Sequence, residues 1–252
     1  NVIKKVKKGR KFDKMNLKNK YLMIILAVII IKTNFSINVQ AKEYNRFNNI
    51  SIEDGLSQAT VETMMQDSKG YIWLGTNDGL DRYNGYTFKK YSYEKGQENS
   101  LVNSYILDIK EDSEGNIWVA TAAGISKIYN DGEKVQNYTS DSESGNLSND
   151  NTTTMLISNS NKIYVGTAEG INLYDKKTDK FNLIYPELKE EYVNSLAEDK
   201  YGNIWAGTEN GLYKINVVTN AIERFESTDD VNTISENYIY KVYYDGDKHI
   251  WI

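Results

Sequence analysis

One short phrase recurs five times along this chain of 252 residues and constrains its fold more than any other feature. In each copy a hydrophobic residue comes directly before an aromatic one. After one further residue comes Gly-Thr-x-x-Gly or a close variant, which the last copy does not reach. The aromatic residues, called anchors here, include all 4 tryptophans and are Trp73, Trp118, Tyr164, Trp205 and Trp251. They lie 45, 46, 41 and 46 residues apart, within the range of about 40–50 residues that is typical of propeller blades.

Each copy is expected to form four antiparallel strands. The first strand carries apolar residues three apart, as at Ile106 and Ile109, and an Asp-x-x-Gly turn connects it to the anchor strand. The Gly-Thr-x-x-Gly segment makes a second tight turn, and third and fourth strands follow. The recurring turn residues are Asp67, Asp112 and Asp199 in the first turn and Gly79, Gly124, Gly170 and Gly211 in the second. The sequence therefore predicts an all-β fold, a β-propeller of four-stranded antiparallel blades.

The predicted blades cover residues 56–92, 101–139, 147–185 and 188–226, with a partial blade at 234–252. We expect between four and five blades, which is an incomplete ring, and therefore an N-terminal fragment of a longer protein. The connection before Leu188 is five residues shorter than the others, which places a deletion in a blade-to-blade loop. Residues 44–47 repeat the fourth-strand pattern without strands before them, so we predict a closure strand that pairs with the last blade of the ring.

Residues 1–41 form a basic segment with an apolar run, which is predicted to be a signal peptide. They hold 10 of the 30 Lys and Arg residues, and Tyr21 to Ile31 is too short an apolar run to cross a bilayer. Cleavage after Ala41 is expected, with an uncleaved signal anchor as the alternative; either way the repeats lie outside the cytoplasm, at the extracellular face of the membrane. The remaining residues carry 20 basic and 34 acidic side chains, which argues against a nucleic-acid partner.

A residue found in every blade serves what every blade needs, so the anchors are expected to be inter-blade core rather than sugar-stacking platforms. A binding site should instead use residues that differ between blades. The turn between strands two and three and the loop between blades are predicted to lie on one face, where we place the candidate site. Its residues are Asn77, Asp78, Asn103, Tyr105, Glu169, Tyr192, Glu209, Asn210 and Tyr238, and the alternative is that they are ordinary solvated loop positions.

Aromatic and amide side chains around a ring mouth suit an oligosaccharide, a peptide or another small molecule. With 0 cysteines and His249 as the only histidine, neither a metal site nor a catalytic triad is expected, and no cofactor is implied.

The segment from Leu56 through Asp67, Trp73 and Gly79 to Asn84, with its later copies, resembles the two-component regulator propeller repeat. The resemblance implies seven-bladed propellers that form the extracytoplasmic input region of transmembrane histidine kinases, hybrid sensors or diguanylate cyclases. It also implies a membrane helix and a cytoplasmic output module further along the chain, and a dimer in the full-length receptor.

Three functions remain open at this point. The first is a ligand-sensing input domain of a transmembrane receptor, with no catalysis in this stretch. The second is a secreted propeller glycoside hydrolase or lyase, which needs an opposed pair of carboxylates in the ring mouth. The third is a secreted carbohydrate-binding, adhesion or scaffolding propeller.

Overall fold

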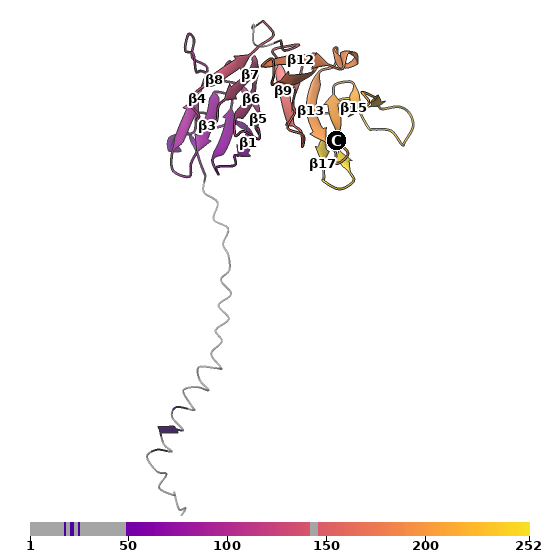
Figure 1. Ribbon diagram of the computed structural model, residues 1–252. Coiled ribbons are helices and arrows are strands. Elements are labelled where there is room, and N and C mark those ends of the chain that lie inside the picture. Colours follow the sequence, from indigo (N-terminus) through magenta and orange to yellow (C-terminus); the bar gives the residue numbers. More distant parts are fainter. Residues whose placement is uncertain (1–17, 19–20, 23–24, 26–48, 142–145) are drawn as a thin grey trace, which may run out of the picture. The chain divides into compact units, whose positions relative to one another are not determined.

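The computed structural model describes residues 18, 21, 22, 25, 49–141 and 146–252. The chain divides into a unit of residues 1–48 and a unit of residues 49–252, and all the described strands belong to the second (Figure 1). The predicted signal segment is described only at four exposed helical positions, while its cleavage site and the closure strand at 44–47 lie outside the described residues. Among the described residues no helix is long and apolar enough to cross a membrane.

The second unit contains four antiparallel sheets of four strands each, in which the strands pair in chain order (Figure 1). The predicted all-β propeller fold is confirmed. The first blade comprises β1 (Val61–Gln66), β2 (Ile72–Thr76), β3 (Gly79–Tyr83) and β4 (Phe88–Tyr91), and the second comprises β5 (Ile106–Glu111), β6 (Ile117–Thr121), β7 (Gly124–Ile128) and β8 (Val135–Tyr138). The third comprises β9 (Thr152–Ile157), β10 (Ile163–Thr167), β11 (Gly170–Asp175) and β12 (Lys180–Ile184), and the fourth comprises β13 (Val193–Glu198), β14 (Asn203–Thr208), β15 (Gly211–Asn216) and β16 (Ile222–Phe225).

Three short pieces complete the described secondary structure. A two-stranded sheet follows the fourth blade, and single turns of 3₁₀-helix precede the first and fourth blades. They are β17 (Tyr243–Tyr244) with β18 (Ile250–Trp251), η1 (Ile52–Asp54) and η2 (Pro186–Leu188). The fifth copy was expected to begin its strand at Ile239; the structure pairs only Tyr243 and Tyr244, although Ile239 and Val242 are buried.

A β-bulge in the innermost strand explains how residues three apart can both be buried, as in the second blade. In β5 the register shifts between Ile106 and Asp108, so Leu107 is an extra residue and Ile106 and Ile109 are both buried. Regular alternation would turn residues three apart to opposite faces of the sheet. Similar shifts occur in the pairings of β1, β9 and β13.

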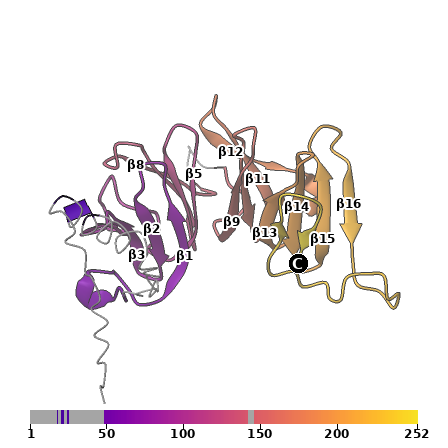
Figure 2. The same cartoon turned by 90° about the horizontal axis from the view of Figure 1, so that it is seen from below.

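Successive blades pack face to face through continuous hydrophobic clusters. One cluster joins Trp73 and Leu80 of the first blade to Leu101, Ile106 and Ile109 of the second. Two further clusters join the second blade to the third and the third to the fourth. The innermost strands β1, β5, β9, β13 and β17 consequently lie next to one another in chain order (Figures 1 and 2).

Each tryptophan anchor of the four complete blades is hydrogen-bonded to the aspartate of the preceding turn. Asp112 accepts the backbone N–H groups of Glu114 and Asn116, both at 2.9 Å, through Oδ1, and its Oδ2 accepts the Trp118 Nε1–H at 2.8 Å. Equivalent indole bonds join Trp73 to Asp67 at 2.8 Å and Trp205 to Asp199 at 3.0 Å. The carboxylate therefore closes the turn and also satisfies the only polar group of the buried indole.

These hydrogen bonds also control ionisation. Burial opposes the charged form of Asp199, but the hydrogen bonds from Asn203, Trp205 and the turn backbone outweigh that effect and hold the pKa of its carboxyl below the ordinary value.

The expectation that every anchor is buried is wrong for the last one. Trp73, Trp118 and Tyr164 are at most 2% exposed, whereas Trp205 is half-buried and Trp251 is 61% exposed. An aromatic side chain of the fourth strand stacks on the indole in three blades, at ring-centroid distances of 5.6 to 5.7 Å.

A polar cluster ties the second blade to the third. The side chains of Tyr138, Tyr174 and Gln136 all donate hydrogen bonds to the carboxylate of Asp179, which lies in the turn between β11 and β12. Burial opposes the charge of Asp179, but these three bonds outweigh it and lower the pKa of its carboxyl; burial and the same contacts raise the pKa of Tyr138.

We expect Trp118→Ala to lower the free energy of unfolding of the full chain by about 3–5 kcal/mol, because it empties a fully buried site between two blades. Trp251→Ala, the matched control at an exposed anchor, should change it by less than about 1 kcal/mol. Denaturant titration followed by circular dichroism measures both, and equal losses would contradict the described packing.

The Asp179 cluster predicts a dependence of stability on pH. A carboxyl group whose pKa is lowered by folding stabilises the protein above its unfolded pKa, and that stabilisation disappears as the pH falls through the folded pKa. Stability of the natural chain should therefore decline below about pH 4. Asp179→Asn should show a weaker decline, whereas the exposed control Asp229→Asn should follow the natural chain in denaturant titrations from neutral to acid pH.

Candidate functional site

The candidate site is a cavity of about 540 Å³ lined by residues of all five repeats. Four of the nine predicted site residues lie in it, namely Tyr105, Tyr192, Glu209 and Tyr238. The remaining lining residues are Glu62, Leu107, Ala122, Asn151, Thr153, Asn194, Tyr240 and Lys241. We call it the inner cavity, because the innermost strands and the loops that enter them supply most of its wall.

Backbone hydrogen bonds hold this wall together. The Glu209 N–H donates to the carbonyl oxygen of Tyr192 at 3.3 Å, and the Ala122 N–H donates to that of Tyr105 at 3.1 Å. These bonds tie the turn between the second and third strands to the loop that enters the innermost strand of the same blade. A related bond of 2.7 Å joins the Gly79 N–H to the Ser104 carbonyl oxygen of the next blade. These bonds agree with the prediction that the turn between strands two and three and the loop between blades lie on one face.

A threonine in each turn fixes the turn residues. The Thr208 hydroxyl donates to the Gly211 carbonyl oxygen at 3.0 Å and accepts the Asn210 N–H at 3.0 Å. Gly211 adopts a φ of 131°, and a Cβ there would lie 2.7 Å from the Phe225 carbonyl oxygen. Only glycine fits this position without strain, so the turn presents Glu209 and Asn210 in one defined conformation.

Five predicted residues lie outside the inner cavity. Asn77 and Asp78 are exposed in the turn between β2 and β3. The other three make local hydrogen bonds. Asn103 accepts the Tyr105 N–H at 2.7 Å, Glu169 accepts from the Asn149 amide at 3.0 Å, and Asn210 donates to Glu191 at 3.1 Å.

Five of the eight lining residues that the sequence did not predict follow a simple positional rule. Glu62, Leu107, Thr153 and Asn194 are the extra residues of the four bulges, each one position after the first paired residue of its innermost strand. Tyr240 occupies the corresponding position after Ile239. A bulge re-aims one side chain out of the regular alternation, which here brings it to the cavity. The sequence signal for these residues was the spacing of three positions between the apolar residues of an innermost strand.

The cavity wall combines flat aromatic surfaces with groups that form hydrogen bonds. Tyr105 and Tyr238 are 41% and 53% exposed, so their rings are open to a ligand. Asn151 donates to the Tyr192 hydroxyl at 3.2 Å, and Asn194 donates to the Ile239 carbonyl oxygen at 3.1 Å, which fixes both amides. Glu62, Glu209 and Lys241 are exposed and add charges of both signs. Such a wall can hold a polar molecule through ring stacking and hydrogen bonds.

The comparison with known families separates the third blade, which has a different anchor, from the other complete blades. The model of the two component regulator propeller matches residues 55–78, 100–123 and 187–210, which cover the anchor segments of the first and second blades and of the fourth. The third blade, where Tyr164 replaces tryptophan, lies outside the matched residues.

Known proteins are similar to this chain in part of their sequence or in fold. Histidine kinase P4 of Formosa agariphila is 39% identical over 64 residues, which are 25% of this chain and 5% of that protein. The virginiamycin B lyase of Staphylococcus aureus, solved with quinupristin as an inactive variant, has a TM-score of 0.56 at 14% identity over 75% of this chain and 61% of its own. The extracellular domain of a putative one-component system of B. thetaiotaomicron is 20% identical over 82% of this chain and 38% of its own, and its TM-score of 0.36 is too low to support an argument.

The structure defines a protein of the β-propeller class, and the lyase similarity at 14% identity supports that fold alone. Within this class, three repeats of the chain match the model of the two component regulator propeller, in agreement with the resemblance noted from the sequence. The chain spans less than two thirds of the length of each of these three proteins.

Proposed function

We propose that this propeller is the extracytoplasmic ligand-sensing input region of a transmembrane receptor of the two-component type. Three matched repeats of the regulator propeller family and the similarity to a histidine kinase support this role. The basic and apolar segment at residues 1–41 supports a location outside the cytoplasm. Attachment to the membrane by a signal anchor or a downstream helix, and dimerisation of the complete receptor, belong to the same proposal.

The inner cavity is the observation that carries the sensing role. Every repeat contributes to it at equivalent positions, yet the side chains differ between repeats, as the series Glu62, Leu107, Thr153, Asn194 and Tyr240 shows. Positions that serve the fold alone, such as the turn glycines and the aspartates, keep their identity in most copies. Side chains that differ along a shared wall are what recognition of one particular molecule requires.

The chemistry of the wall favours an oligosaccharide or a short peptide. Tyrosine faces stack on sugar rings or aromatic side chains, while carboxylates and amides bond to hydroxyl or amide groups. No cofactor or metal enters this mechanism. A ligand that contacts several repeats at once binds better to one arrangement of the blades than to another. That difference in affinity shifts the populations of the two arrangements, and the shift can be passed to the next domain.

The test is a signalling assay on the complete receptor with a panel of oligosaccharides and peptides. Tyr105→Ala and Glu209→Gln should raise the ligand concentration needed for half-maximal response by about tenfold each, since each removes one stacking or hydrogen-bonding partner. Tyr86→Ala is the matched control, because Tyr86 is 90% exposed and lies outside the cavity.

Ligand binding by the isolated chain should weaken in the same two variants, which calorimetry can measure. A full response in both variants, with protein levels equal to those of the natural receptor, would contradict the assignment of the inner cavity as the sensing site.

A further inference from the structure

The third blade lacks three side chains that seal the first and second blades on their outer side. In those two blades an aspartate accepts a hydrogen bond from the anchor indole. A tyrosine of the fourth strand also donates a hydrogen bond to the next blade. Tyr91 donates to the Gly132 carbonyl oxygen at 3.1 Å, and Tyr138 donates to Asp179 at 2.8 Å. The third blade has Ser158, Tyr164 and Ile184 at the corresponding positions.

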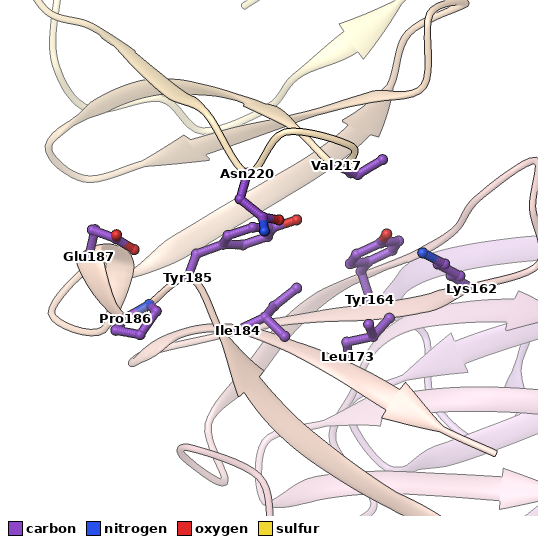
Figure 3. A pocket seen from close by; sticks show the side chains of 9 residues that line it. All are labelled: Lys162, Tyr164, Leu173, Ile184, Tyr185, Pro186, Glu187, Val217 and Asn220. Atoms are coloured by element: carbon purple, nitrogen blue, oxygen red, sulfur yellow. The ribbon is translucent and has the colours of Figure 1, made fainter. Parts of the chain in front are cut away.

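These replacements leave a cleft of about 450 Å³ between the third and fourth blades, here called the lateral cleft (Figure 3). Ile184 has no hydroxyl to reach the hairpin between β15 and β16, which supplies Val217 and Asn220 to the opposite wall. Leu173 completes an apolar surface, and the volume lies within the range of small-molecule sites.

Tyr164 lines this cleft, and its hydroxyl is a hydrogen-bond donor there. The side chain is 2% exposed, yet among the described residues no hydrogen-bond partner of its hydroxyl is found, and Ser158 bonds instead to Ser160 and to the Lys162 N–H. Burial raises the pKa of Tyr164 to about 12, so the group stays protonated and can donate. No buried side-chain polar atom of the described residues lacks a hydrogen-bond partner, so the Tyr164 hydroxyl is open to water in the cleft, and a ligand acceptor can replace that water.

The shortened loop closes the other end of the cleft. Tyr185 adopts a left-handed φ of 56° and directs its ring toward the same space as Tyr164 (Figure 3). Pro186 and Glu187 of η2 follow it at the rim. A non-glycine residue in this conformation is disfavoured, and such outliers concentrate at ligand sites.

The cleft wall contains a single cationic side chain, that of Lys162. Lys162 is exposed beside Tyr164 in Figure 3, and within the described part of the chain its ammonium group forms no ion pair. The only carboxylate of the cleft wall, Glu187, lies at the opposite end. The Lys162 ammonium gives this end of the wall a positive charge that can pair with an acidic ligand, while the negative charge of Glu198, outside the cleft wall, also acts on Tyr164.

We propose that the lateral cleft binds a small amphipathic carboxylic acid. Its carboxylate accepts from the Tyr164 hydroxyl and pairs with the Lys162 ammonium, while its apolar body lies against Leu173, Ile184 and Val217. This site is separate from the inner cavity and does not depend on the sensing role.

The probe is 3-phenylpropanoate, compared with the neutral 3-phenylpropanol, in calorimetric titrations of the full chain. The natural chain should bind the acid and prefer it to the alcohol. Tyr164→Phe, which removes only the hydroxyl, should weaken binding of the acid about tenfold without loss of thermal stability. Lys162→Met should abolish the preference for the acid, whereas Lys95→Met, at an exposed lysine of the loop after the first blade and outside the cleft, should bind like the natural chain.

A variant whose cleft is filled by larger side chains is the decisive comparison with the natural chain. The double substitution Ser158→Asp with Tyr164→Trp restores the pair found in the other complete blades and should give a folded chain that does not bind the acid. Absence of acid binding by the natural chain at millimolar concentration, or undiminished binding by the folded double variant, would overturn the proposal.

Discussion

The hydrogen bond from an anchor indole to a turn aspartate is the interaction on which this propeller depends. A tryptophan buried between two blades contributes a large apolar surface, but its Nε1–H must find an acceptor. Asp112 supplies that acceptor and closes the preceding turn through two backbone N–H groups. Because one carboxylate fixes both the turn and the ring, the anchor strand is held in register where the next blade packs.

A second constraint sets how closely the blades approach one another. It is the small residue two positions after each anchor of the complete blades, which faces the next blade. A Cβ on Gly75 would lie 2.6 Å from Ile106 of the next blade, and one on Gly166 would lie 2.8 Å from Val193. In the second blade Ala120 replaces glycine, and the facing residue becomes the smaller Thr152, whose hydroxyl bonds to the Thr121 backbone. The two exchanges compensate, so the blades keep a similar separation.

The sequence predicted the strands and turns well because their signals are local, as with Asp112 and Gly124 at fixed offsets from an anchor. It predicted the cavity only in part. Leu107 and its equivalents reach the cavity through a bulge, which depends on pairing across strands and cannot be read from alternation. The exposure of Trp251 and the lateral cleft beside Tyr164 were missed for a related reason, since both depend on what a neighbouring strand or blade supplies.

A double-mutant cycle on Asp112 and Trp118 tests the central claim most directly. Asp112→Ala and Trp118→Phe, alone and together, should give a coupling free energy of about 1.5–3 kcal/mol in denaturant titrations, because the bond joins an indole donor to a charged acceptor. The same cycle on Ser158 and Tyr164, which share no hydrogen bond in the structure, should give a value near zero. Equal coupling in the two blades would contradict the account.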